Sequence, residues 1–447
     1  MRILALALVL ALASGGCAPP ASDSPGAEPR ESGSGGAVEA QEATDLEPTV
    51  VLISLDGTRA VDVDPGRLPS LVAFGESGLV AEALVPVDPS NTFPNHVSLA
   101  TGVVPEVHRL VNNHFVDPDR GDFHKKHSER WIESEPIWSV AERAGIRAAS
   151  YYWVGSEGAW TGGPGPSEWR RFSSRTSERA KVDQILAWLD EPDPARRPRL
   201  ITCWFHGADH EGHESGPDSE AVTRVLALQD RQIARLVEAI EDRGLFDRLT
   251  LVIVSDHGMT TAEKRVNLAD RLRRGGLRVR VLGIGGFASV VFRERGAVPE
   301  QAARAVEIAR EAGLEAHVRA QAPRSWRVGD PRFGDVVVRA PIGTAIVAPT
   351  TLIEGFHGYD ARRPEMAALL VARGRGVEPG TRVGRVSNLA IAPTVLRLLG
   401  LPIPEQMRAP PIQAMLRGLE GATGEVGRPG PGAEGARENG SNTERTE

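Results

Sequence analysis

The sequence predicts an α/β fold, in which a doubly wound, mostly parallel central sheet is flanked by helices and carries a smaller inserted α+β subdomain. Nearly continuous apolar runs at 49–55, 199–205 and 249–254 are typical of strands buried on both faces. Stretches with apolar residues at helical spacing lie between these runs: 181–189 precedes the second run, and 219–243 precedes the third. Hydrophobic residues make up 41% of the 447 positions, which supports a large core, and two cysteines exclude a disulfide framework.

The first 17 residues are predicted to be a lipoprotein-type signal peptide. Arg2 precedes an apolar run at 3–13 that is too short to span a bilayer, and small residues then lead to Cys17. A cysteine in this position resembles a bacterial lipobox, although Ser14 stands where leucine is usual. We therefore expect an exported chain, lipidated at Cys17 and anchored in the bacterial envelope on its periplasmic or cell-surface side. Ordinary cleavage that leaves a free thiol is the alternative.

Two segments are predicted to be disordered, a tether at 18–47 and a tail at 419–447. Both are rich in Ala, Ser, Gly, Pro and Glu, and such segments bury too little apolar surface to offset the entropy of ordering. The remaining residues, 48–418, form the predicted catalytic domain. A net charge of −7 gives no basic footprint for nucleic acid, and no protein partner is evident from the sequence.

Acidic residues and histidines follow three of the predicted strands. The first strand ends at Asp56, the second leads to Asp209 and His213, and the third ends at Asp256-His257. Open α/β sheets place their ligands at the carboxyl ends of parallel strands, so these side chains are expected to meet. For Asp56 a simpler interpretation is a chain turn with Gly57.

The pattern changes from about 260 to 350, where we predict the inserted α+β subdomain. Glycine-broken strands at 279–292, an amphipathic helix at 300–312 and a strand at 335–340 make up this region. A glycine-flanked His357 follows it. The main sheet is then expected to resume at 366–372, before a closing helix at 390–399.

Two interpretations fit the polar stretch from Ser90 to His96. In the first, its hydroxyl and amide side chains cap the helix that follows. In the second, Thr92 is a nucleophile presented to a metal, because a threonine hydroxyl needs a metal or a base for activation. The second interpretation gains weight from a set of oxygen and imidazole donors elsewhere in the chain: Asp56, Asp209, His213, Asp256, His257 and His357.

This donor set suits a catalytic metal centre. Oxygen and imidazole donors without thiolate favour zinc or another borderline divalent metal. Asp209 and His213 have i, i+4 spacing, so one helical turn can bring both to one ion. Six donors can hold two ions, and two ions about 4 Å apart form a clamp for in-line displacement at phosphorus.

A series of short segments resembles the nucleotide pyrophosphatase/phosphodiesterase family of the alkaline phosphatase superfamily. They are 55–59, 91–96, 101–102, 105–108, 136–138, 153–157, 209–213, 255–259, 357–360 and 392–400, together with Asn113. The resemblance implies an enzyme that hydrolyses phosphodiester or phosphoanhydride bonds of a small-molecule substrate with two zinc ions.

The resemblance also implies roles for individual residues. Thr92 would be the nucleophile, and Asn113 with a backbone N–H near Thr92 would hold a non-bridging phosphoryl oxygen. One zinc would be held by Asp209, His213 and His357, and the other by Asp56, Asp256, His257 and the Thr92 oxygen.

In nucleotide-cleaving members two aromatic residues flank the base, and the resemblance matches Phe93 to one and Phe172 to a usual Tyr. Trp204 lies at another position where Tyr is common, and all three rings keep a face for stacking, although Phe172 and Trp204 could simply be core. Arg109 stands where the family usually has glycine and is either a phosphate contact or a solvated side chain. The substrate stays open between nucleotides, phospholipid headgroup esters and smaller diesters. Alternative functions are a phosphonoacetate hydrolase, a phosphomonoesterase or a non-catalytic surface lipoprotein.

Overall fold

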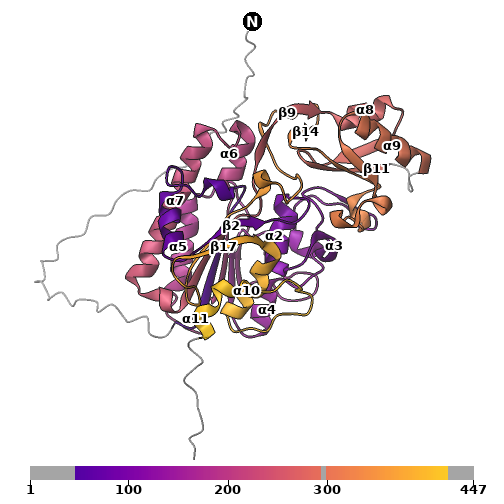
Figure 1. Ribbon diagram of the computed structural model, residues 1–447. Coiled ribbons are helices and arrows are strands. Elements are labelled where there is room, and N and C mark those ends of the chain that lie inside the picture. Colours follow the sequence, from indigo (N-terminus) through magenta and orange to yellow (C-terminus); the bar gives the residue numbers. More distant parts are fainter. Residues whose placement is uncertain (1–45, 293–298, 421–447) are drawn as a thin grey trace, which may run out of the picture. The chain divides into compact units, whose positions relative to one another are not determined.

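The computed structural model describes residues 46–292 and 299–420 (Figure 1). The predicted signal peptide, nearly all of the predicted tether and the tail from 421 lie outside these residues. Within the two described ranges, none of the helices has the length and apolar character needed to cross a membrane.

An eight-stranded sheet forms the centre of the fold, with the strand order β17-β2-β16-β8-β1-β7-β5-β6. Its strands are β1 (Thr49–Leu55), β2 (Leu79–Val85), β5 (Ala148–Tyr151), β6 (Glu168–Arg170), β7 (Leu200–Phe205), β8 (Leu249–Val254), β16 (Leu370–Gly374) and β17 (Thr381–Ser387). β1 pairs in parallel with both β7 and β8, whereas β16 is antiparallel to both β8 and β2. The predicted mostly parallel sheet is confirmed.

Helices cover both faces of this sheet. They are α1 (Pro69–Glu76), α2 (Thr92–Thr101), α3 (Pro105–His108), α4 (Ile137–Arg143), α5 (Glu178–Leu189), α6 (Gly207–Ser215), α7 (Glu220–Asp242), α10 (Ile391–Leu398) and α11 (Arg417–Glu420). In Figure 1, α5 and α7 lie together on one side of the sheet, and α4 and α10 on the other. Ser219 caps α7 by accepting a hydrogen bond from the backbone N–H of Val222 (3.2 Å).

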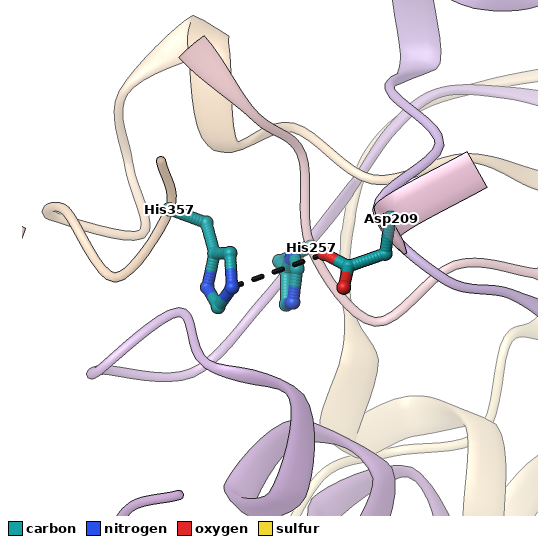
Figure 2. A group of neighbouring side chains, drawn as sticks. All are labelled: Asp209, His257 and His357. Carbon is teal, nitrogen blue, oxygen red and sulfur yellow. Dashed lines mark ion pairs between the residues drawn. The ribbon is translucent and has the colours of Figure 1, made fainter. Parts of the chain in front are cut away.

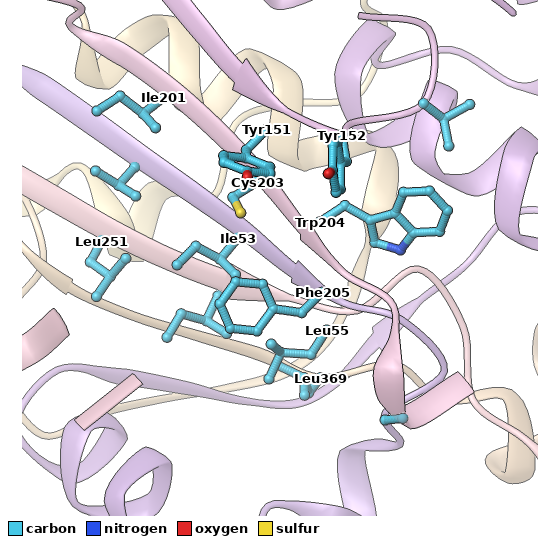
Figure 3. Close-up of a cluster of buried hydrophobic side chains, with 14 of the residues drawn as sticks. Ile53, Leu55, Tyr151, Tyr152, Ile201, Cys203, Trp204, Phe205, Leu251 and Leu369 are labelled. Carbon is cyan, nitrogen blue, oxygen red and sulfur yellow. The ribbon is translucent and has the colours of Figure 1, made fainter. Parts of the chain in front are cut away.

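The two helical layers explain why β1 is apolar at nearly every position. Ile53 and Leu55 belong to the core shared with α5 and α7, whereas Val50 and Leu52 belong to the core shared with α2, α4 and α10. Because alternate residues of a strand point to opposite faces, both sets must be apolar. Figure 3 shows the first of these cores, in which Phe205 lies beside Ile53 and Leu55.

The inserted region forms its own layers. A four-stranded antiparallel sheet has the order β10-β11-β13-β12 and packs against α8 and α9. Its elements are α8 (Leu268–Arg274), β10 (Val279–Leu282), β11 (Phe287–Phe292), α9 (Pro299–Glu311), β12 (Glu315–Val318) and β13 (Val336–Arg339). A hairpin of β3 (Val116–Asp117) and β4 (Gly121–Asp122) lies earlier in the chain.

A three-stranded sheet leads from the inserted region back to the main one. It consists of β14 (Gly343–Ile346), β9 (Thr260–Val266) and β15 (Gly355–Phe356), in that order. β9 begins shortly after His257, and β15 pairs antiparallel with the start of β9, with Phe356 opposite Thr260. This pairing brings His357, the residue after β15, next to His257.

Candidate active site

Polar residues meet at the carboxyl edge of the three central strands β1, β7 and β8. Asp56 follows β1, α6 after β7 carries Asp209 and His213, and β8 leads to Asp256 and His257. Figure 2 shows Asp209, His257 and His357 converging from three separate segments of the chain. The structure thus gathers all six predicted metal donors around Thr92.

Three of the donors form a first group. The Nε2 atoms of His213 and His357 are 3.2 Å apart, and Asp209 Oδ1 lies 3.6 Å from the former and 3.8 Å from the latter. His213 reaches this position because it lies one helical turn after Asp209 on α6.

The second group surrounds His257. Its Nε2 atom lies 3.2 Å from Asp256 Oδ2, 3.6 Å from Asp56 Oδ1 and 3.2 Å from the Thr92 hydroxyl. The ring of His257 stacks on that of His357, with centres 3.9 Å apart, so the two groups share a border. His257 is close enough to Asp209 and His357 to serve either group.

The residues fit divalent cations. Asp56 Oδ1, Asp209 Oδ1 and Asp256 Oδ2 are buried and accept no hydrogen bond from the described residues. A buried carboxylate oxygen without a partner is costly, and a cation removes that cost.

The orientation of the histidines also suits cation binding. The Nδ1 atoms of His213, His257 and His357 lie 2.8–3.0 Å from the backbone carbonyl oxygens of Gly355, Gly258 and Ser90. An Nδ1–H that donates to a carbonyl leaves the Nε2 lone pair directed at the donor groups, which is the usual arrangement of metal-binding histidines.

Without metal, burial favours the neutral forms of the carboxyl and imidazole groups in the site. Burial, followed by the neighbouring carboxylates, raises the pKa of Asp56, and burial with the charge of Asp209 raises the pKa of Asp256 to about 8. Burial lowers the pKa of His257 to about 3 and that of His357 well below its usual value. Metal binding would therefore release protons from the two carboxyl groups.

These shifts predict how stability changes with pH when metal is removed. The folded chain retains carboxyl protons that the unfolded chain has lost above about pH 4, so the free energy of unfolding should fall as pH rises toward 8. Each fully retained proton contributes a slope of about 1.4 kcal/mol per pH unit. The histidines of the unfolded chain still lose protons up to about pH 7.5, which adds a rise in stability that is the same with and without metal, because burial keeps the folded histidines neutral.

Urea unfolding between pH 6.5 and 8.5, with chelator and with zinc, measures this slope. We expect a steeper decline with chelator, because bound cations keep the carboxylates ionised in the folded state. Parallel curves for the two preparations would contradict the metal assignment.

Thr92 is the first residue of α2 and is 7% exposed. Asn91 occupies the cap position, but its side chain makes no cap hydrogen bond and instead donates to Asn112 Oδ1 (2.7 Å). The Thr92 hydroxyl faces His257 rather than a backbone N–H of its own helix. The capping interpretation of Thr92 is therefore wrong.

Asn113 lies beside Thr92, the predicted nucleophile. Its Oδ1 accepts a hydrogen bond from the backbone N–H of Phe93 (2.8 Å), the residue directly after Thr92. This bond fixes the amide group and leaves the Nδ2 donors of Asn113 for a substrate oxygen. The Phe93 N–H is thus one backbone donor near Thr92 that is already engaged.

The predicted aromatic contacts differ in character. Phe172 is 41% exposed and stacks on Trp204, with ring centres 5.1 Å apart and planes at 25°. Trp204 is only 8% exposed, so its face is covered, whereas Phe172 retains an outer face. Phe93 is half-buried and contacts Phe123 edge to face (5.7 Å).

Two residues near the site were missed by the sequence reasoning. His96 is fully buried, with Nδ1 3.3 Å from Asp256 Oδ2, and its position four residues after Thr92 on α2 was a usable signal. Lys125 has its ammonium 5.3 Å from the centre of the Phe93 ring. Burial lowers the pKa of Lys125, while the charges of Asp209 and Asp56 oppose that change.

Arg109 is paired with two carboxylates, and its side chain is 37% exposed. Its guanidinium pairs with Asp330 (2.6 Å) and Glu133 (3.6 Å). The exposed fraction is in line with the solvated side chain that the sequence suggested, whereas the phosphate contact stays a prediction. Lys125, unlike Arg109, is close enough to Asp209 and Asp56 for their charges to act on its pKa.

A family model described as type I phosphodiesterase / nucleotide pyrophosphatase matches residues 50–360. The fold and this match together define a hydrolase of phosphoric ester bonds. The chain belongs to the type I phosphodiesterase / nucleotide pyrophosphatase family, which confirms the resemblance seen in its motifs.

Several named relatives share this similarity. An uncharacterised pyrophosphatase/phosphodiesterase of Schizosaccharomyces pombe is 30% identical over 394 residues, which cover 80% of this chain and 78% of the relative. An ectonucleotide pyrophosphatase/phosphodiesterase of Caenorhabditis elegans is 29% identical, covering 79% of this chain and 43% of the relative. Ectonucleotide pyrophosphatase/phosphodiesterase family member 3 of Rattus norvegicus is 34% identical, covering 48% of this chain and 25% of the relative. The chain thus spans less than half the length of these two animal relatives.

Solved structures support the fold. Human ectonucleotide pyrophosphatase/phosphodiesterase 5 matches with a TM-score of 0.73 and 24% identity, covering 80% of this chain and 96% of that protein. A murine counterpart with the same values is an inactive form in complex with AMP.

Proposed function

We propose that this chain is a metal-dependent phosphodiesterase or nucleotide pyrophosphatase with Thr92 as its nucleophile. The observation that carries the proposal is the buried Thr92 hydroxyl, which lies 3.2 Å from His257 Nε2 at the border of two donor groups. We propose two zinc ions, one held by Asp209, His213 and His357, and one by Asp56, Asp256, His257 and the Thr92 oxygen.

The chain's own residues then carry out a double displacement. Bound divalent cations would lower the pKa of a hydroxyl and neutralise charge on a leaving oxygen. The Thr92 oxygen attacks phosphorus, so that a bond from Oγ1 to phosphorus forms and the bond to the leaving alkoxide or nucleotide breaks; the hydroxyl proton is lost to solvent, and the leaving oxygen takes up a proton. Water then attacks the phosphothreonine from the opposite side and releases the Thr92 hydroxyl. The amide of Asn113 donates to a non-bridging oxygen as charge develops there.

The substrate side of the site favours a nucleotide. The murine relative binds AMP, and the exposed face of Phe172 offers a stacking surface for a base. Lys125 adds a cation near the carboxylates, where a phosphate chain would gain from it. Lysophospholipids and smaller diesters are the competing substrates, and a preference for monoesters would indicate a phosphomonoesterase.

A substrate comparison tests this proposal. Zinc-loaded protein lacking residues 1–20 is assayed with bis-aryl and mono-aryl phosphates, ATP, a dinucleotide and a lysophospholipid. We expect kcat/KM to be higher for the bis-aryl ester, because the neutral Asn113 amide suits a singly charged phosphoryl group. A roughly tenfold preference for the monoester, about 1.4 kcal/mol in transition-state stabilisation, would reject the diesterase assignment.

We also propose that the chain is exported and lipidated at Cys17, from Arg2, the apolar run and the small residues before the cysteine. Mass spectrometry of the mature N-terminus should find an acylated Cys17. A soluble mature chain that starts at another residue would contradict this assignment.

A further inference from the structure

The indole N–H of Trp204 contacts Asp56, a predicted metal ligand. Stacking on a base would use the face of the ring instead. Its indole Nε1–H donates to Asp56 Oδ2 (2.9 Å) in a bond that is fully buried. The other oxygen, Asp56 Oδ1, has no hydrogen-bond partner among the described residues and lies 3.6 Å from His257 Nε2. The indole therefore determines which carboxylate oxygen faces the donor cluster.

The backbone of Trp204 is itself held in place. Lys181 on α5 is completely buried, and its ammonium donates to the Trp204 carbonyl oxygen (2.9 Å). The same ammonium pairs with Glu178 Oε2 (2.6 Å) and lies 3.3 Å from His206 Nδ1. A buried lysine is costly unless it is paired, so these contacts resist any shift at the end of β7.

Ring contacts fix the plane of the indole. Phe172 stacks on it at 5.1 Å, and His96 packs against it at 5.2 Å. His96 in turn places Nδ1 3.3 Å from Asp256 Oδ2. Trp204 thus contacts Asp56 directly and lies one ring away from Asp256.

A neutral donor is well suited to this position. An indole N–H can only donate, so it holds one carboxylate oxygen without adding charge or competing for the cation as a ligand. A cationic donor would instead offset the negative charge that attracts the metal. Such outer contacts orient ligands, and their loss typically weakens metal affinity about 10–100-fold.

We propose that Trp204 is a positioning residue for the metal site: its indole N–H holds Asp56 so that Oδ1 is presented to the cation. This inference depends on the proposed function in one respect, which is that a divalent cation binds at the site. Phe172, by contrast, makes its ring contacts with Tyr152, Trp204 and His206, none of which is a predicted ligand.

Zinc affinity tests the proposal without use of catalysis. Trp204→Phe removes the N–H and keeps an aromatic ring, and competition with a chelator of known affinity then measures zinc binding. We expect one of the two zinc equivalents to bind roughly 10–100-fold more weakly. The matched control is Trp188→Phe, since Trp188 is buried and donates to Glu168 Oε2 (2.9 Å) away from the donor cluster. That control should leave both equivalents unchanged.

A second replacement covers the case in which Trp204→Phe does not fold. Benzothienylalanine at position 204 has the size and shape of tryptophan but carries sulfur in place of the N–H group. We expect the same weakening of one zinc equivalent. Phe172→Leu keeps the indole N–H, so it should weaken zinc binding far less than the benzothienylalanine replacement, and it should raise KM for a nucleotide. Unchanged zinc affinity in the benzothienylalanine protein would overturn the proposal. If wild-type protein binds zinc but cleaves no phosphate ester, the proposed function fails while this inference stands.

Discussion

The Thr92→Ala variant is expected to lose roughly three orders of magnitude or more of kcat while it keeps its full zinc content. The substitution removes the oxygen that attacks phosphorus, but the six carboxylate and imidazole donors around it remain. Thr92→Ser should keep part of the activity, because a hydroxyl is still present at the start of α2. Steady-state kinetics and metal analysis on the same preparations measure both quantities.

A matched control exists on the same helix. Thr101 is fully buried at the last turn of α2 and donates its hydroxyl to the Val97 carbonyl (2.7 Å), away from the donor cluster. Thr101→Ala makes the same chemical change and should reduce stability, with little effect on kcat. Retention of more than about a tenth of wild-type kcat/KM by Thr92→Ala, a loss of under about 1.4 kcal/mol, would show that Thr92 is not the nucleophile.

Substitution of Asp256 should have the second largest effect. Asp256→Asn keeps an oxygen that can accept the hydrogen bond from the Gly57 N–H (3.2 Å), but it removes the charge and one metal donor. We expect about one zinc equivalent to be lost and activity to fall by two or more orders of magnitude, since disturbing even outer-shell contacts typically costs 10–100-fold.

Asp256→Asn should also change the stability of the metal-free chain. Burial raises the pKa of Asp256 to about 8 in the metal-free chain, so its ionisation at high pH destabilises the fold. With chelator at pH 8.5, Asp256→Asn should therefore unfold at a higher urea concentration than wild type. Asp230→Asn is the control, because this buried carboxylate accepts hydrogen bonds from Ser70 and Leu71 N–H groups remote from the site. It should lose stability and keep both zinc equivalents. Full zinc content in Asp256→Asn would contradict its assignment as a ligand.

The sequence predicted the sheet because its main strands are buried on both faces. β1, β7 and β8 are buried at every position and mostly apolar. Asp56 follows β1 directly, and Asp256-His257 follows β8 after one serine. Local spacing also predicted that Asp209 and His213 share a helical face. These signals depend on residues that are close in the chain, so one sequence suffices to read them.

Other features depend on contacts between distant residues. The Trp204–Asp56 hydrogen bond joins positions 148 apart, and no periodicity predicts which tryptophan edge will meet a carboxylate. β16 runs antiparallel between β8 and β2, although its apolar sequence resembles that of a parallel strand. Lys125 lies in an irregular loop, with its ammonium above the ring of Phe93. Arg109 pairs with Asp330, which is distant in sequence.

The stereochemical course at phosphorus tests the covalent role of Thr92 most directly. A nucleotide diester with a chiral phosphorothioate is hydrolysed in isotopically labelled water by the zinc-loaded protein, and the configuration of the product is determined. Attack by Thr92 followed by attack of water gives two inversions, so we predict net retention. Net inversion would mean that water attacks phosphorus in a single step, and it would contradict the threonine-nucleophile account.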